Sequence, residues 1–257
     1  MTSHYWDDLT RGKSPHLSYP LWRHYCDALH SSLLHEWIGG RRFSLALKTD
    51  LFDEACGVGM APALARFAQI LVGIDIAESI VEQASRRYPY LEAHVEDVRH
   101  LSYPANSFDL IFSNSTLDHF SQPGELQQAV HELVRVLRDG GLLLLTLDNP
   151  LHPVVAIRNQ ISRFWSGQNA LLPYQMGHTL SLRQMVHLLE SCHCKILRRS
   201  HLLHIPRVLF LHLSRNVDPS TCLGRQMVAS MLAFEGLQSL PTSPLTGHFA
   251  AILAVKR

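Results

Sequence analysis

Short apolar runs alternate with stretches of helical periodicity through the middle of the chain. The apolar runs predict strands at residues 50–54, 70–74, 91–95, 108–113 and 142–147. Between them, apolar residues recur at helical spacing in residues 61–69, 78–88 and 125–137. This alternation predicts an α/β fold with a doubly wound, mostly parallel sheet and helices on both faces. Such sheets bind ligands at the carboxyl ends of their strands.

The pattern differs on either side of this region. Residues 16–38 have apolar side chains at helical spacing, and Gly39 and Gly40 then end the pattern. Residues 151–190 have a mainly helical pattern, and residues 249–255 predict a last strand. We therefore predict an N-terminal helical cover at 1–48, a binding core at 49–148, and a helical lid plus final strands at 149–257.

Composition excludes several classes of protein. The chain has 257 residues, of which 46% are hydrophobic, and a formal net charge of +1, so bulk charge indicates neither a nucleic acid nor a membrane partner. Five cysteines fit a reducing compartment better than a disulfide framework. The first residues are polar, and the apolar runs are far shorter than the ~20 residues of a membrane span. We expect a cytoplasmic protein without a membrane span.

A glycine-containing turn follows the first predicted strand, in the sequence LFDEACGVG of residues 51–59. A dinucleotide fingerprint requires a third glycine where this chain has Pro62, and the lysine of a phosphate-binding P-loop is also missing. The turn therefore predicts close backbone approach to a small zwitterionic ligand rather than to a phosphate group.

Two further acids follow predicted strands. Asp75 ends the second strand about 20 residues after Asp53, where a carboxylate can accept both hydroxyls of a ribose. Its alternative role is to cap the next helix, because Asp is a favoured N-cap. Asp97 follows the third strand, and a proline-containing loop and a Phe-Asp pair then lead into the fourth.

In this order and spacing the motifs resemble those of class I S-adenosylmethionine-dependent methyltransferases, particularly the small-molecule branch called type 11. The matching segments, within about residues 49–147, are LFDEACGVG, LVGID, EDVRHLSYPANSFD, LIFSNSTLDHF and VLRDGGLLLLTL. The resemblance implies a Rossmann-like methyltransferase fold with seven strands and a helical insertion after the fifth. It also implies S-adenosyl-L-methionine as cofactor and methyl transfer to a small-molecule acceptor, with O-methylation favoured.

The resemblance also implies which residues bind the cofactor. The turn Ala55–Gly59 would lie against its methionine part, Asp53 would hold the ammonium, and Asp75 the ribose. The adenine would contact residues after the second and third strands, and residues ending the fourth strand would face the methionine part and the substrate. The implied cofactor-binding residues are Asp53, Ala55, Cys56, Gly57, Gly59, Asp75, Ile76, Asp97, Val98, Ser113 and Asn114.

The turn departs from the family's pattern at two positions. Ala55 stands where the family has its first glycine, and Glu54 occupies a position that is usually apolar. Glu54 has two alternative roles, facing the cofactor site or pairing with Lys48, and we favour the pairing.

Methyl transfer is an in-line displacement, so the enzyme mainly aligns the acceptor and excludes water. A base is needed when the acceptor is a neutral hydroxyl or a protonated amine. His119 follows the fourth strand and is the candidate catalytic base; its alternative role is to pack or hydrogen-bond at a helix start.

Substrate choice is expected to depend on the segments outside the core. Residues 149–184 contain no acids, which favours an apolar or partly anionic acceptor, although an ordinary packed helical layer explains the pattern equally well. The expected contributors are Arg158, Arg163, Phe164, Trp165, Tyr174, Met176 and Arg183.

Other classes of function remain open. The Cys and His residues of 192–204 do not have the spacing of a zinc site, so we expect no metal. One alternative is a nicotinamide-dependent oxidoreductase or epimerase, disfavoured by Pro62 and by Asp97 with Val98. Another is a non-catalytic cofactor-binding partner protein, which Glu54 and Ala55 keep open. The sequence does not predict the oligomeric state.

Overall fold

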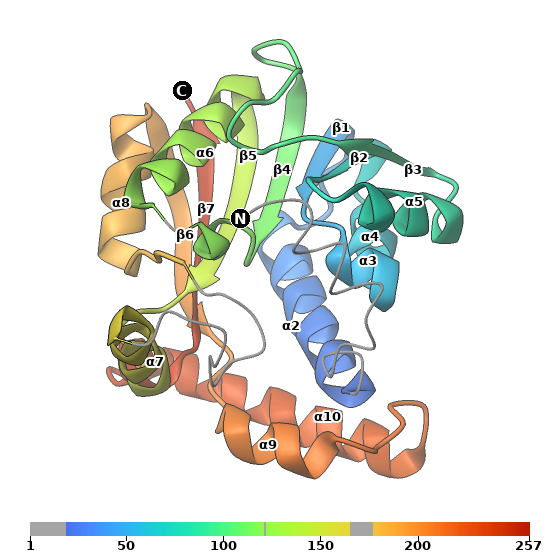
Figure 1. Ribbon diagram of the computed structural model, residues 1–257, viewed down its shortest axis with the longest axis vertical. Helices are drawn as coiled ribbons and strands as arrows, with labels where there is room; N and C mark the ends of the chain where they lie inside the picture. Colours follow the sequence, from blue (N-terminus) through green and yellow to red (C-terminus); the bar gives the residue numbers. More distant parts are fainter. Residues whose placement is uncertain (1–18, 121, 165–176) are drawn as a thin grey trace.

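The computed structural model describes residues 19–120, 122–164 and 177–257, which form a single seven-stranded sheet flanked by helices (Figure 1). The strand order is β3-β2-β1-β4-β5-β7-β6. The first five strands are parallel, and β7 runs antiparallel between β5 and β6. The expected doubly wound, mostly parallel sheet is therefore confirmed. The strands are β1 (Phe43–Thr49), β2 (Ala68–Asp75), β3 (Leu91–Val95), β4 (Phe108–Asn114), β5 (Leu137–Asp148), β6 (Cys194–Leu202) and β7 (Phe249–Lys256).

Helices cover both faces of the sheet and also gather beyond the carboxyl ends of the strands (Figure 1). On one face, α2 (Pro20–Ile38), α4 (Ala61–Leu64) and α5 (Glu78–Arg87) enclose one hydrophobic core. On the other face, α6 (Pro123–Val136) and α8 (Leu182–Ser191) enclose a second core. The remaining helices are α3 (Phe52–Cys56), η2 (Leu117–His119), α7 (Pro153–Phe164), α9 (Arg207–Ser214), α10 (Cys222–Ala233), η3 (Phe234–Ser239) and α11 (Ser243–Thr246).

The helical periodicity of residues 16–38 corresponds to α2. Pro20 lies in its first turn, where a missing amide proton costs nothing, and Gly39 ends it with φ 67°. Its apolar side, including Leu21, Leu29 and Leu33, is buried against the sheet. The helix also packs against α9 and α10, so the N-terminal and C-terminal helical regions share one layer.

The first strand is the main difference from the sequence prediction. Residues 50–54 were expected to be a strand, but β1 ends at Thr49 and Phe52–Cys56 form the short helix α3. The structure explains the change, because Asp50 adopts φ 63° and its Oδ1 accepts a hydrogen bond from the Phe52 amide (2.8 Å), which turns the chain. All of β1 except its last residue therefore lies before residue 49, at which we placed the start of the core.

The predicted helix at 61–69 is also shorter than expected. It is limited to α4, and Ala68 already begins β2. Among the described helices, none has the combination of length and apolar character that crossing a bilayer requires.

Candidate functional site

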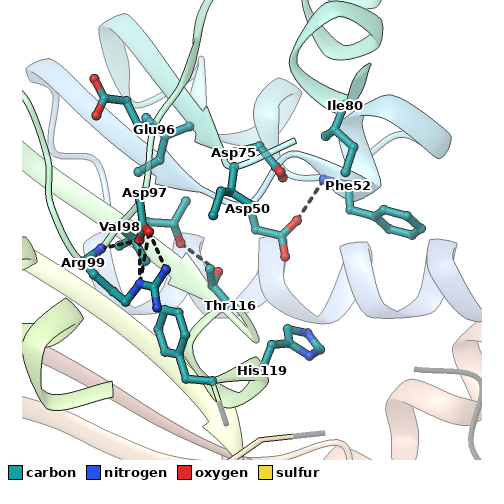
Figure 2. Close-up of a pocket in the computed structure, with 14 residues that line it drawn as sticks. Asp50, Phe52, Asp75, Ile80, Glu96, Asp97, Val98, Arg99, Thr116 and His119 are labelled. Carbon is teal, nitrogen blue, oxygen red and sulfur yellow. Dashed lines mark hydrogen bonds and ion pairs between the residues drawn. The ribbon is translucent and has the colours of Figure 1, made fainter. Parts of the chain in front are cut away.

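A pocket lies at the carboxyl ends of β1, β2 and β4, next to the loop after β3 and to η2 (Figure 2). This is the position at which parallel α/β sheets bind ligands. Its lining residues are Thr49, Asp50, Phe52, Ile74, Asp75, Ile76, Ile80, Glu96, Asp97, Val98, Arg99, Thr116, His119 and Phe120. Five of them were predicted from the sequence: Asp75, Ile76, Asp97, Val98 and His119.

Asp75 is buried at the end of β2 and has both structural and pocket-facing roles. Its Oδ2 accepts the Leu51 amide and its Oδ1 accepts the Ala77 amide, both at 2.9 Å, so it fixes the chain on either side of the pocket. Each carboxylate oxygen retains a lone pair for a ligand. Burial and the neighbouring Asp50 raise the pKa of Asp75 to about 7. The two roles considered for Asp75 are thus compatible.

Asp50 lies beside Asp75 and was not predicted as a site residue. The pairing of Thr49 with Ile74 places both acids immediately at the ends of adjacent strands. Burial raises the pKa of Asp50, although the nearby Lys48 opposes the shift. Lys48 and Thr49 interrupt the apolar run before Asp50, so the sequence carries no strand-end signal at this acid.

Asp97 pairs with Arg99 in the loop after β3. The Arg99 guanidinium donates to Asp97 Oδ2 through Nη2 (2.6 Å) and to Oδ1 through Nε (2.9 Å). Burial raises the pKa of Asp97, but the Arg99 hydrogen bonds outweigh it, and this pKa lies below its ordinary value. Arg99 also pairs with Glu125 of α6 and lies over the Phe120 ring, 5.3 Å from its centroid. Arg99 therefore braces the pocket wall.

Three hydroxyl groups meet at the ends of β1 and β4. Thr49 Oγ1 donates to Ser113 Oγ (2.9 Å) and lies 2.8 Å from Thr116 Oγ1. Thr49 and Thr116 line the pocket, whereas Ser113, which is as fully buried as Thr49, is not a lining residue. Asn114 is half-buried and is not a lining residue either.

His119 lies in η2, at the rim of the pocket (Figure 2). Its Nε2 is 3.9 Å from Oδ1 of Asp118, which is buried. Asp118 Oδ2 accepts the Asp148 amide (3.0 Å), so the carboxylate has a fixed position. Burial and Asp148 raise the pKa of Asp118 to about 6. The Asp118 carboxylate lies too far from the ring for a hydrogen bond, so only its charge acts on His119.

The glycine turn contributes no residue to the lining of this pocket. Asp53 forms an ion pair with Arg23 of α2 (2.8 Å), and the Gly59 amide donates to Asp27 Oδ2 (3.2 Å). Arg87 of α5 donates to the Gly57 carbonyl. The predicted residues outside the pocket lining are Asp53, Ala55, Cys56, Gly57, Gly59, Ser113 and Asn114.

Glu54 pairs with Lys48, as favoured from the sequence. Its Oε2 is 3.0 Å from Lys48 Nζ, and both side chains are buried. Its Oε1 accepts the Met60 (2.7 Å) and Ala61 (3.0 Å) amides at the start of α4. Gly59 has φ 67°, and a Cβ there would approach Glu54 Cδ to 2.5 Å, so the turn needs this glycine. Glu54 therefore shapes the turn from inside the protein.

The predicted lid is described in part. Arg158 of α7 pairs with buried Asp148 (2.6 Å), and Arg183 of α8 is exposed. The side chains of Arg163, Phe164, Trp165, Tyr174 and Met176 lie outside the described residues. Within the described ranges there is no cluster of three or more His, Cys, Asp or Glu side chains suited to a metal ion.

Comparison with protein families places a known domain over this region. Residues 52–145 match the family model described as a methyltransferase domain. A probable S-adenosylmethionine-dependent methyltransferase of Mycolicibacterium smegmatis is 28% identical over 116 residues, 45% of this chain and 44% of that protein. A ubiquinone biosynthesis O-methyltransferase of Coxiella burnetii is 26% identical over 104 residues, 38% of this chain and 43% of that protein. The alignment thus spans less than half of these curated relatives.

Solved structures share the fold over most of the chain. A methyltransferase from Methanosarcina mazei has a TM-score of 0.59 at 16% identity, covering 87% of this chain and 96% of that one. The [4+2]-cyclase SpnF has a TM-score of 0.57 at 18% identity, covering 90% and 81%. Because these identities are low and one protein is a cyclase, the likeness establishes the fold and leaves the reaction open.

Proposed function

We propose that this chain, which carries a class I S-adenosylmethionine-dependent methyltransferase domain, binds S-adenosyl-L-methionine in the pocket and transfers its methyl group to a small-molecule acceptor. The observation that carries the proposal is the chemistry of the pocket at the carboxyl ends of β1, β2 and β4. It is rich in carboxylates, has apolar walls and contains no lysine or glycine cradle among its described lining residues.

The residues present fit the nucleoside part of this cofactor. Asp75 lies where it can accept the two ribose hydroxyls, because each of its oxygens uses one lone pair on a backbone amide. Ile76, Ile80 and Val98 offer apolar walls for a flat adenine ring. Asp97 lies at the end of these walls, where its carboxylate can accept the adenine amino group despite its pairing with Arg99.

The charge of the pocket fits a cationic ligand. Asp50, Asp75, Glu96 and Asp97 line it, against one guanidinium, that of Arg99. S-adenosylmethionine carries a sulfonium and an ammonium and has no phosphate. A nicotinamide dinucleotide would instead bring a pyrophosphate close to these carboxylates, which electrostatic repulsion opposes.

We assign the base to His119, and we favour a hydroxyl acceptor. When bound, the cofactor supplies an electrophilic methyl group. His119 stands at the pocket rim and would take the acceptor's proton as the new bond forms, and the negative charge of Asp118, 3.9 Å away, would stabilise the resulting imidazolium. The likeness to an O-methyltransferase of Coxiella burnetii supports the choice of oxygen.

A non-catalytic cofactor-binding protein is the second candidate function. The observation that favours it is the glycine turn, which α2 and α5 hold outside the pocket. Mass spectrometry of a metabolite extract incubated with the protein and S-adenosylmethionine separates the two candidates. Methylated products support the enzyme, whereas cofactor binding without any product supports the second candidate.

Ligand-dependent melting tests the choice of cofactor. S-adenosylhomocysteine at a hundred times its Kd should stabilise the fold by about 2.7 kcal/mol, and NAD and NADP should leave the melting temperature unchanged. The variant Asp75→Ala should lose most of the shift, because it loses charge-assisted hydrogen bonds worth about 1.5–3 kcal/mol each. Stabilisation by NAD or NADP alone would overturn the proposal.

A further inference from the structure

Two acids lie close together after β1 but have different surroundings. Asp50 follows the last residue of the strand, and Asp53 lies in the first turn of α3. The family pattern selects Asp53, because that residue precedes the glycine turn. The structure allows the two to be compared as partners for a cation.

Asp53 already has a cationic partner within the protein. Arg23 Nη1 lies 2.8 Å from Asp53 Oδ1, and the same guanidinium lies over the Phe52 ring, 5.4 Å from its centroid. The Asp53 side chain is 46% exposed and is not part of the pocket lining. These contacts fasten α2 to α3. They give Asp53 a structural role that is satisfied without a ligand.

Asp50 lines the pocket and keeps one oxygen available. Its Oδ1 accepts the Phe52 amide (2.8 Å), whereas its Oδ2 has no hydrogen-bond partner among residues 19–120, 122–164 and 177–257. Figure 2 shows the hydrogen bond between its carboxylate and Phe52, with Asp75 and His119 among the other lining residues. The strand pairing of Thr49 with both Ile74 and Ser113 fixes Asp50 at the centre of the sheet edge.

Lys48 lies two residues before Asp50 and does not form an ion pair with it. Its Nζ lies 3.0 Å from Glu54 Oε2 and donates to the main-chain carbonyls of Thr49 (3.3 Å) and Asp50. An ammonium has three protons, and these three acceptors use them. In the described part of the chain, the Asp50 carboxylate therefore lacks an ion-pair partner while lying next to a second carboxylate, Asp75.

We infer that Asp50, in place of Asp53, receives the ammonium group of the cofactor's methionine part. The inference rests on the proposed function and departs from the family's residue pattern. A primary ammonium at Oδ2 would supply the missing hydrogen-bond donor and reduce the repulsion between Asp50 and Asp75. It would also place the methionine part above β1, between the ribose at Asp75 and the pocket rim at His119.

A comparison of two ligands tests this inference. S-adenosylhomocysteine carries the ammonium, and 5′-methylthioadenosine has the same nucleoside and sulfur without the amino acid. By calorimetry, Asp50→Asn should weaken S-adenosylhomocysteine ten- to a hundredfold and methylthioadenosine less than threefold. Asp75→Asn should weaken both ligands by similar factors, because both contain the ribose.

Asp53→Asn is the matched control, since it removes one charge three residues away. It should change neither affinity more than threefold. Asn at position 50 retains the oxygen that caps Phe52 and tolerates the left-handed backbone of Asp50, so this variant should fold. A melting curve close to that of the parent protein checks the fold.

The outcomes separate this inference from the proposed function. A loss confined to S-adenosylhomocysteine in Asp53→Asn, rather than in Asp50→Asn, would restore the family's assignment and overturn ours. Equal losses of both ligands in Asp50→Asn would also overturn it, because they would show a change of pocket shape. Binding of neither ligand to the parent protein would overturn the proposed function and this inference with it.

Discussion

At the scale of a single residue, the surroundings of Asp75 oppose the charge that ligand binding requires of it. Its carboxylate holds two backbone amides, yet it lies buried beside Asp50, and these surroundings raise its pKa to about 7. A ribose diol needs the ionised form as acceptor. Without a ligand, the fold therefore shifts Asp75 toward its protonated form. Binding of the ribose has to release that proton.

This conflict predicts a pH-dependent cofactor affinity. Because the folded pKa is raised, Asp75 is mostly protonated below about pH 7, and binding has to expel that proton. Affinity for S-adenosylhomocysteine should be constant above pH 7.5 and fall by up to tenfold per unit below pH 7. Calorimetry between pH 5.5 and 8 measures it. The slope should become much shallower in Asp75→Asn, where Asp50 remains to titrate, and persist in His119→Ala; an unchanged slope in Asp75→Asn would assign it to another group.

Removing the His119 side chain at the pocket rim should lower the rate of methyl transfer without weakening cofactor binding. With a hydroxyl acceptor, His119→Ala should lower the methyl-transfer rate by roughly 10²–10⁴ and leave cofactor affinity nearly unchanged, because only proton removal is affected. Near-normal turnover of a hydroxyl acceptor by the variant would reduce His119 to a packing residue.

At the scale of elements, the buried Lys48–Glu54 pair connects β1 to the start of α4. Burial alone would lower the pKa of Lys48, but the Glu54 carboxylate outweighs it and keeps this lysine charged. Glu54 also accepts two amides at the start of α4. Removing either partner would leave an unpaired charge in the core.

Single substitutions of this pair should be strongly destabilising. Lys48→Met or Glu54→Gln should each lower the free energy of unfolding by about 3–5 kcal/mol, and the double variant should lose less than the sum. Urea denaturation measures these values. Glu82→Gln, in the exposed Arg86–Glu82 pair of α5, is the control and should change stability by less than about 1 kcal/mol. Additive losses would show that the two side chains act independently.

Sequence patterns predicted the strands and helices well where the apolar periodicity was strong, and they predicted β1 poorly. The strands β2, β4 and β5 and the helices α5 and α6 lie where apolar patterns placed them. The strands carry runs of apolar residues that are buried on both faces of the sheet, and each helix buries one continuous side. The short apolar run Leu51–Phe52 suggested a strand, but so short a run does not distinguish a strand from a helix. The left-handed turn at Asp50 separates β1 from α3. It depends in part on a tertiary contact, the hydrogen bond from the Leu51 amide to Asp75.

The turn at Asp50 also determines which residues near the end of β1 line the pocket. Asp75, Ile76, Asp97, Val98 and His119 follow strands or lie in loops whose ends were correctly located, and they line the pocket. The residues from Asp53 to Gly59 were placed by motif alone. Their partners within the protein, Arg23, Asp27 and Arg87, lie on α2 and α5, and no local pattern reveals contacts between such distant segments.

At the scale of the whole molecule, one carboxylate joins the N-terminal and C-terminal helical regions. Glu235 of η3 accepts the Tyr25 hydroxyl of α2 (2.8 Å) and the amides of Leu203 (3.0 Å) and His204 (3.1 Å). Leu203 has φ 63°, so this carboxylate also holds a strained turn after β6. Tyr25 is fully buried, and a lost partner there would not be replaced by water.

Removing the Glu235 carboxylate, which is remote from the pocket, should cause a large loss of stability. Glu235→Ala should lower the free energy of unfolding by about 2–5 kcal/mol, because it leaves several donors unsatisfied, and Tyr25→Phe by about 1 kcal/mol. Denaturant titration gives both values. Gln238→Ala, which removes an exposed contact to Ser200 from the same helix, should change little. Equal effects of the two η3 variants would contradict a special role for Glu235.

The insertion of β7 between β5 and β6 has a consequence for synthesis of the protein. While a ribosome makes the chain, β5 emerges about a hundred residues before β7, its neighbour in the finished sheet. At roughly 5–20 residues per second, the nascent chain carries an unpaired edge of β5 for about 5–20 s. β6 emerges earlier than β7 too and has no strand to join until then. Unpaired strand edges recruit other chains, so this interval is when newly made molecules are most prone to aggregate.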